Sequence, residues 1–259
     1  MIRSHLILSA LNVASHYPKA VASGADVIAI DLEDSVPVDR KSEALVKLIT
    51  LLQQPGPKVQ VRVNPGPTDM RALEDAGVSG RIAEVIVPKV RHIGHVWDAS
   101  LGHPSVVIIE EAEGVVNAER ILQQPIVRGA IIGRSDMARS LGRPDRFANL
   151  DYVVARVAVA ARAFDKYALD CCLQVRDLAA AREQWQRAAQ VGIHAGACIH
   201  PSQVAVANHV FAPQGQMLGW CEEQVEAEDT NGGLPYIAAD GGVVGRPHYR
   251  AARASLEAR

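Results

Sequence analysis

The sequence lacks three short motifs that mark common enzyme sites: GxGxxG, GxxxxGK[ST] and GxSxG. The usual glycine-rich phosphate cradles and the strained nucleophile elbow of hydrolases are therefore absent. There is also no internal repeat of fixed period and no low-complexity tract, which argues against a repeat architecture. A function has to be sought in residues spread along the chain.

Long apolar runs and charge of one sign are also missing. No run approaches the roughly 20 apolar residues that cross a bilayer, and the N-terminus has no apolar core of a secretion signal. The net charge is −2, and the Lys and Arg residues are scattered rather than gathered in a stripe. We expect a cytoplasmic protein with neither a membrane nor a nucleic acid as partner.

Cysteine is scarce, with four residues in the chain. Cys171, Cys172, Cys198 and Cys221 have neither paired CxxC spacing nor the density of a disulfide-stapled secreted domain. We expect them to be reduced and packed in the interior.

The chain does contain a regular alternation of strand-like and helix-like segments. With 259 residues it is about the size of one barrel of eight strand–helix units. A long amphipathic helix is predicted at about 150–164, and another opens at the N-cap Asp177 and closes before Gly192. The strand-like runs are Arg3–Leu8, Val27–Asp31, Val59–Asn64, Val85–Val87, Val106–Glu110, Val127–Ile132, Tyr167–Leu169 and Ala195–His200. This pattern predicts an α/β fold, a (β/α)8 TIM barrel over residues 1–212.

The pattern changes after Pro213, where residues 213–259 read as a helix, a short hairpin with Asp240-Gly241-Gly242, and a last helix. These residues are too few for an independent core. We expect the segment to pack on the barrel or on a neighbouring subunit.

Most of the strand-like runs end in a charged or hydrogen-bonding residue, which is typical of barrels whose chemistry lies at the carboxyl ends of the strands. Glu110 and Asp136 are candidate Mg2+ ligands, because two carboxylates at successive strand ends can converge on one ion. Alternation along the strand predicts that only one of Glu110 and Glu111 faces the barrel mouth. The alternative is that the two candidates cap helices or pair with Arg134 and Arg139.

Arg62 lies in a run that should be buried, so its guanidinium must meet an anion. That anion is either a structural carboxylate, with Asp31, Glu33 and Asp34 available, or a substrate oxygen that becomes negative. His200, at the end of the last strand-like run, is either a structural residue or a wall of the site.

At these residues the chain resembles the citrate lyase beta-subunit family, acyl-CoA lyases that are grouped with the HpcH/HpaI aldolases. The likeness covers nearly the whole chain in the right order. The tail around Ala239–Val244 is similar to the family's C-terminal lid. The matching stretches are Asp26–Val36, Val61–Asn64, Val87–Lys89, Ile109–Gly114, Gly133–Asp136 and Ile199–Gln203.

The resemblance implies a barrel that forms trimers or hexamers, Mg2+ held by Glu110 and Asp136, and Arg62 beside a thioester oxygen. It also implies Asp34 near the metal's waters and Lys19 at the coenzyme A phosphates. Asp240 occupies the lid position that, in relatives cleaving malyl-type thioesters, reaches the active site of the adjacent subunit.

The implied activity is Mg2+-dependent cleavage of a carboxylated 3-hydroxyacyl-CoA, of the citryl, citramalyl or malyl type, to acetyl-CoA and an α-keto acid. Arg134 would either weaken Mg2+ binding or bind a further substrate carboxylate. Two alternatives stay open: a class II aldolase acting on free 2-keto-3-hydroxy acids, and a non-autonomous beta subunit of an acyl-carrier-protein-dependent lyase complex.

Overall fold

The computed structural model describes residues 2–212, 215–239 and 241–257. The chain forms two compact units, one from Ile2 to Val210 and one that begins at Phe211. Among the described residues, no helix combines the length and the apolar character needed to span a bilayer.

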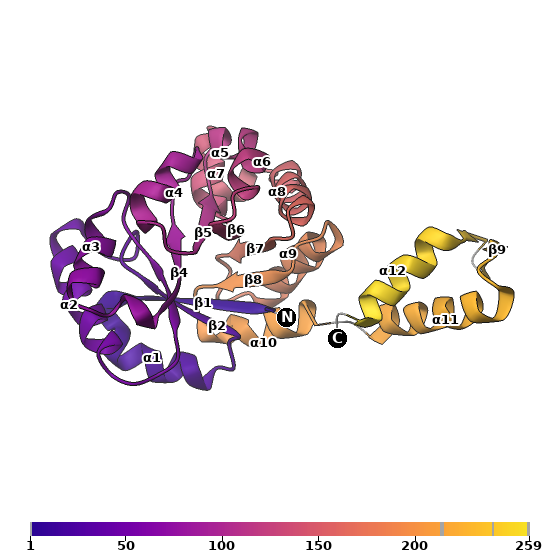
Figure 1. Ribbon diagram of the computed structural model, residues 1–259, viewed down its shortest axis with the longest axis horizontal. Helices are drawn as coiled ribbons and strands as arrows, with labels where there is room; N and C mark the ends of the chain where they lie inside the picture. Colours follow the sequence, from indigo (N-terminus) through magenta and orange to yellow (C-terminus); the bar gives the residue numbers. More distant parts are fainter. Residues whose placement is uncertain (1, 213–214, 240, 258–259) are drawn as a thin grey trace. The chain divides into compact units, whose positions relative to one another are not determined.

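The larger unit is a closed barrel of parallel strands in sequence order, with β1 pairing β8 to complete the ring (Figure 1). This confirms the predicted (β/α)8 TIM barrel. The strands are β1 (Ser4–Ser9), β2 (Val27–Asp31), β3 (Val59–Arg62), β4 (Ile82–Val87), β5 (Ser105–Ile109), β6 (Val127–Ile132), β7 (Tyr167–Cys172) and β8 (Ala195–Cys198).

Helices surround the barrel and follow the strands along the chain (Figure 1). The Asp177 side chain accepts a hydrogen bond of 2.9 Å from the Ala180 N–H, which confirms the predicted N-cap of α9. The helices of this unit are α1 (Val13–Ala22), α2 (Lys41–Leu52), α3 (Thr68–Asp75), α4 (Ile93–Ser100), α5 (Ala112–Val116), α6 (Ala118–Leu122), α7 (Arg134–Ser140), α8 (Asp151–Ala163), α9 (Leu178–Gln190) and α10 (Val204–Val210).

Strands buried on both faces explain why the sequence shows continuous apolar runs rather than strict alternation. Every residue of β5 is buried, and β6 has one exposed residue, Arg128. The predicted bounds of β2 and β6 agree with the structure. The strand β7 was predicted to end at Leu169 but continues for three more residues, to Cys172. All four cysteines are free thiols. Cys172, Cys198 and Cys221 are buried, as expected, whereas Cys171 is partly exposed.

The smaller unit pairs α11 (Gly215–Asn231) with α12 (Arg246–Glu257) around an antiparallel hairpin of β9 (Tyr236–Ile237) and β10 (Val243–Val244). Tyr249 is buried between them, and its hydroxyl donates to the Leu234 carbonyl at 2.8 Å. The predicted helix–hairpin–helix is therefore confirmed. Asp240 lies outside the described residues.

A glycine in β8 makes room for the largest buried side chain of the barrel unit. A Cβ built on Gly196 would lie 2.8 Å from ring atoms of Trp185, whose indole N–H donates to the Asp170 carbonyl at 2.9 Å. The absence of a side chain at Gly196 thus lets α9 pack closely against β7 and β8.

We predict that Gly196→Ala lowers the free energy of unfolding by about 1–3 kcal/mol, because the added methyl group forces a fully buried indole to shift. Chemical denaturation followed by circular dichroism measures this change. The matched control is Gly80→Ala, where a Cβ would meet nothing within 4 Å. Equal stability of the two variants would contradict the close packing.

Candidate active site

Two cavities open at the carboxyl ends of the barrel strands, and they share Ile7, Arg62 and Ile199. The first, which we call the lysine cavity, has a volume of about 510 Å3 and is lined in addition by residues that include Asn12, His16, Lys19, Ser35, His200 and Pro201. The second, the carboxylate cavity, has a volume of about 230 Å3 and is lined in addition by residues that include Asp34, Glu110, Arg134 and Asp136. The shared residues make the two cavities neighbours across Arg62.

Arg62, at the end of β3, is held by a buried carboxylate at the end of β2. Its Nε and Nη2 donate to the two oxygens of Asp31, each at 2.6 Å. Asp31 is almost fully buried and also accepts the backbone N–H groups of Glu33 and Ser35, at 2.8 and 3.1 Å. Burial alone would raise the pKa of Asp31, but the bonds and charge of Arg62 outweigh it and hold that pKa below its usual value.

This geometry reconciles the two hypotheses for Arg62. The side-on pair with Asp31 uses two of the five guanidinium N–H groups and fixes the plane of the group. Its Nη1 has a longer contact of 3.4 Å with Glu33. Arg62 therefore has a structural anion, and donors remain at the junction of the two cavities.

Lys89 links two carboxylates that follow β2, Glu33 and Asp34, to Glu110. Its ammonium group bonds to Glu33 and lies 3.2 Å from Asp34, while its backbone N–H donates to Glu110 Oε1 at 2.8 Å. Lys89 has a φ of 54°, in the left-handed region that non-glycine residues seldom adopt. No role was predicted for Lys89 from the sequence. An uncommon backbone conformation next to a strand end is typical of a functional site.

Glu110 is buried in the carboxylate cavity, whereas Glu111 is partly exposed and lies 3.5 Å from Arg91. This is the separation that strand alternation predicts. Burial raises the pKa of Glu110 to about 7, and the negative charges of Asp136 and Glu33 add to the effect. Without a bound cation, burial therefore favours the protonated form of Glu110.

Asp136, in the first turn of α7, lines the same cavity and pairs with Arg139 at 2.5 Å. The alternative reading of this residue as an ion-pair partner is thus partly correct. Arg139 is 67% exposed, however, and such surface pairs contribute little. Among the described residues Glu110 pairs with neither Arg134 nor Arg139.

The residues present fit a magnesium ion. No group of three or more His, Cys, Asp or Glu side chains in the described part of the chain is arranged to hold a metal. Mg2+, however, is commonly bound by one or two carboxylates together with water and substrate oxygens. Gly133 leaves space at the candidate site, since a Cβ there would lie 2.4 Å from Glu110 Oε2. A bound divalent cation would favour the ionised form of Glu110 and so offset the effect of burial on its pKa.

Arg134 does not contact Asp136 through any bond in the structure but turns to β7. Its Nε and Nη2 donate to the two oxygens of Asp170 at 2.7 and 2.9 Å. Asp170 is fully buried, and the Gln184 side-chain amide also donates to it at 2.8 Å. The charge of Arg134 is therefore already compensated, which neither of the two expectations for this residue included.

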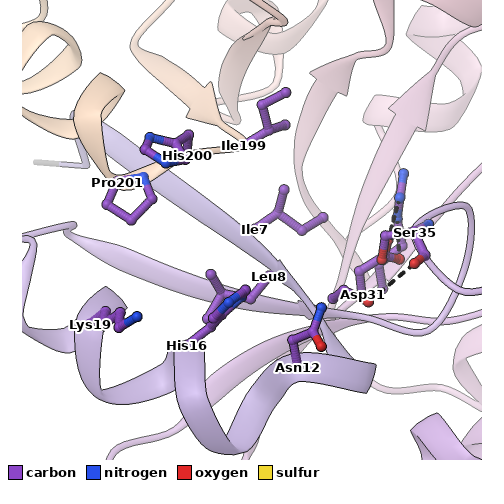
Figure 2. A pocket seen from close by; sticks show the side chains of 12 residues that line it. Ile7, Leu8, Asn12, His16, Lys19, Asp31, Ser35, Ile199, His200 and Pro201 are labelled. Carbon is purple, nitrogen blue, oxygen red and sulfur yellow. Dashed lines mark hydrogen bonds and ion pairs between the residues drawn. The ribbon is translucent and has the colours of Figure 1, made fainter. Parts of the chain in front are cut away.

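The lysine cavity carries Lys19 and two histidines, His16 and His200. Figure 2 shows His16 and Lys19 on α1 and, across the cavity, His200 and Pro201 from the loop after β8. His200 also caps the short helical turn that follows, because its Nδ1 accepts the Ser202 N–H at 3.2 Å. It is thus both a structural residue and a wall of the cavity.

Beneath the carboxylate cavity lies a polar layer that the sequence did not reveal. His5 Nε2 is 2.6 Å from Gln60 Oε1, and the Gln60 amide and the Tyr167 hydroxyl both donate to Glu84, at 2.5 and 2.6 Å. Burial lowers the pKa of His5 to about 4, so its ring is neutral at physiological pH. These residues come from four strands, and only closure of the barrel brings them together.

The structure brings Arg62, Asp34, Glu110 and Asp136 to one cavity and Lys19 to its neighbour. Asp240 cannot be compared with them because it lies outside the described residues. The contact of Arg62 with Glu33 was among the predicted possibilities, whereas the bond between Glu33 and Lys89 and the pairing of Asp170 with Arg134 were not predicted. Glu33, Lys89 and Asp170 all end or follow strand-like runs, which was the signal available in the sequence.

The comparisons with known proteins agree on one family. The chain matches the HpcH/HpaI aldolase/citrate lyase family over residues 5–100 and 102–201. It is 30% identical over 251 residues to the (3S)-malyl-CoA thioesterase of Cereibacter sphaeroides, with 92% of this chain and 88% of that protein covered. It is 26% identical over 249 residues to the mitochondrial citramalyl-CoA lyase of Homo sapiens, with 81% and 71% covered.

Among solved structures, the barrel resembles the protein CitE from Mycobacterium tuberculosis in complex with magnesium, acetoacetate and coenzyme A. The TM-score is 0.86 at 28% sequence identity, and the match covers 98% of this chain and 96% of that one.

We predict that, with chelator present, stability falls as the pH rises from about 4.5 to about 7, by up to about 3 kcal/mol through Glu110. In this window the folded chain keeps a proton on Glu110 that the unfolded chain has released, so raising the pH favours unfolding. Urea denaturation across this range measures the slope. Glu110→Gln is expected to remove the effect, whereas Glu183→Gln on the exposed face of α9 should keep it; parallel curves for wild type and Glu110→Gln would contradict the assignment.

Proposed function

The chain belongs to the HpcH/HpaI aldolase/citrate lyase family, and from that membership and the geometry of its two cavities we propose that it is a Mg2+-dependent carbon–carbon lyase. The substrate is a carboxylated 3-hydroxyacyl-CoA, and the products are acetyl-CoA and an α-keto acid. The (3S)-malyl-CoA thioesterase among its relatives acts on a thioester of this kind, as its name says.

The observation that carries the proposal is the position of Arg62 between the two cavities. The lysine cavity offers Lys19 and His16 to the phosphates of a coenzyme A moiety, and the carboxylate cavity offers oxygen ligands for a cation. A thioester that joins coenzyme A to a carboxylated acyl group would then lie at Arg62. A substrate without coenzyme A would leave the lysine cavity unused.

When it is bound by Glu110 and Asp136, Mg2+ supplies a Lewis acid for the hydroxyl and carboxylate oxygens of the substrate. Asp34 lines the same cavity. Burial alone would raise its pKa, but hydrogen bonds with Glu33 and Lys89 and the positive charge of Lys89 outweigh burial and hold that pKa below its usual value. Asp34 is therefore ionised at neutral pH and can accept a hydrogen bond from the substrate hydroxyl or from a water.

In the cleavage step, the bond between the hydroxyl-bearing carbon and the methylene carbon breaks. The hydroxyl proton passes to the ionised carboxylate of Asp34, directly or through a water, as the keto acid forms, and the electron pair of the broken bond moves to the thioester as an enolate. The free donors of Arg62 stabilise the negative oxygen of that enolate, and removing one such donor typically costs about 100- to 1,000-fold in rate. Because Asp31 already fixes the guanidinium, little reorganisation is needed in the reaction.

We assign the proton that completes acetyl-CoA to Asp240. Residues 213–259 would act as a lid on the active site of an adjacent subunit in a cytoplasmic trimer or hexamer. The support from the described residues is that Leu234, Ile237 and Val243 of this segment are all about two-thirds or more exposed, at 67%, 74% and 67%. Apolar residues gathered on a small unit favour burial against another surface.

We predict chelator-sensitive release of acetyl-CoA from citryl-, citramalyl- or malyl-CoA by the purified chain with Mg2+, measured by mass spectrometry. Arg62→Ala and Glu110→Ala should each lower cleavage by about 100-fold or more. Circular dichroism checks folding, and Arg62→Lys replaces Arg62→Ala if the unpaired Asp31 prevents folding. Cleavage at the wild-type rate in both variants would contradict the proposal.

The same experiment separates the alternatives. Release of free coenzyme A without acetyl-CoA indicates a thioesterase. Cleavage of free 2-keto-3-hydroxy acids, with no need for a thioester, indicates a class II aldolase. Activity that is absent alone and restored by an acyl-carrier-protein-dependent partner complex indicates a non-autonomous beta subunit.

We predict that Asp240→Asn and Glu110→Gln are each inactive but regain part of the activity when the two variants are co-expressed. A mixed oligomer contains sites with an intact Glu110 from one chain and an intact Asp240 from its neighbour. Co-purification through two different tags, followed by the acetyl-CoA assay, tests this. A mixed oligomer without activity would mean that Asp240 serves its own chain or has no role.

A further inference from the structure

The inner wall of the carboxylate cavity is divided into a charged half and an apolar half. Asp34 follows β2, Arg62 ends β3, Glu110 follows β5, and Arg134 and Asp136 follow β6. Apart from His5, the lining side chains that lie within β6, β7, β8 and β1 are apolar or small. Strand alternation points these side chains into the barrel, where they join or pack against the interior cluster. They are Ile131, Cys171, Ala197 and Ile7.

The apolar half has no free cation beside it. Among the described residues that line the carboxylate cavity, the cationic side chains are Arg62 and Arg134. Each of them is paired through Nε and Nη2 with a buried aspartate, Arg62 with Asp31 and Arg134 with Asp170, so the positive charge of each is already compensated. A second substrate carboxylate placed against this wall would add a desolvated negative charge to a cavity that already holds Asp34, Glu110 and Asp136 and whose cations are compensated.

The hydroxyl-bearing carbon of the proposed substrate has four substituents, and the charged half accounts for three. The hydroxyl and the carboxylate belong at Glu110 and Asp136, and the methylene that leads to the thioester points to Arg62. The fourth substituent is left to face the apolar half. A cavity of about 230 Å3 suits a short group and not a long chain.

We propose that Ile131, Cys171 and Ala197 select the fourth substituent and favour a short alkyl group, such as methyl, over both hydrogen and a carboxymethyl group. This inference rests on the proposed lyase function and specifies its substrate class. One methyl or methylene in an apolar pocket typically changes kcat/KM by about 10- to 200-fold. The carboxymethyl group is excluded by charge and the hydrogen by lost contact.

The first test is binding of α-keto acids, which carry the same substituent but need no thioester chemistry. Isothermal titration calorimetry with Mg2+ compares pyruvate, 2-oxobutyrate and oxaloacetate, whose substituents are methyl, ethyl and carboxymethyl. We expect pyruvate or 2-oxobutyrate to bind at least tenfold more tightly than oxaloacetate. Oxaloacetate binding as tightly as pyruvate would overturn the inference.

The second test is the ratio of kcat/KM for citramalyl-CoA to that for malyl-CoA, which differ by one methyl group. We expect a ratio of at least ten in the wild type and a fall of at least tenfold in Ala197→Val, because the added methyl groups occupy the space of the substituent. Ala179→Val, at an exposed position of α9, should leave the ratio unchanged. Cys171→Val is the second variant if Ala197→Val does not fold.

The two tests distinguish the failure of this inference from the failure of the lyase proposal. If no thioester is cleaved but alkyl keto acids bind selectively, the lyase assignment fails while the apolar wall keeps its role as the selecting surface. If thioesters are cleaved and Ala197→Val lowers both kcat/KM values equally, the lyase assignment stands and the inference about the wall is overturned.

Discussion

The buried ion pair between Asp31 and Arg62 is the interaction on which the mouth of the barrel depends. The two side chains are 2% and 15% exposed, and removing one partner of such a pair leaves an uncompensated charge that costs about 3–5 kcal/mol. The pair also joins β2 to β3, where the Leu32 N–H donates to the Arg62 carbonyl at 2.9 Å. By fixing the guanidinium plane it decides where the remaining donors lie, and these donors border both cavities.

Negative charge accumulates around this pair, and the chain compensates it unevenly. Glu33 is bonded to Lys89, and Asp31 is satisfied by Arg62 and two backbone N–H groups. Glu110 receives one backbone N–H, from Lys89, and its pKa rises because burial is not balanced by a cation. No Lys or Arg side chain that the structure describes is thus paired with Glu110, one of the two carboxylates proposed to bind Mg2+. Arg134, which lines the same cavity, is paired with Asp170 instead.

Much of the fold follows from local patterns that a single sequence displays. The strands β2 and β6 are mainly apolar runs, with Arg128 as the exposed exception in β6, and α9 begins at a side chain that caps it, so the ends of these elements could be predicted from the sequence. The predicted end of β7 was early because Asp170 interrupts the apolar run, although it is buried and paired in the structure. Burial of a charged residue depends on its partner, and the partner is not visible in the run itself.

The sequence by itself determined which polar residues end or follow the strand-like runs, and the barrel rule predicted Arg62, Glu110 and Asp136 at one rim. Only the tertiary structure decided how they are used: that Arg62 is anchored yet has donors to spare, that Arg134 turns away to Asp170, and that an apolar wall faces the carboxylates. These outcomes depend on pairs separated by 31 and 36 residues, such as Arg62 with Asp31 and Arg134 with Asp170. Which donor meets which acceptor at that separation is fixed by closure of the barrel and by the packing of α7 and α9, because hydrogen bonds require distances that residue order does not contain.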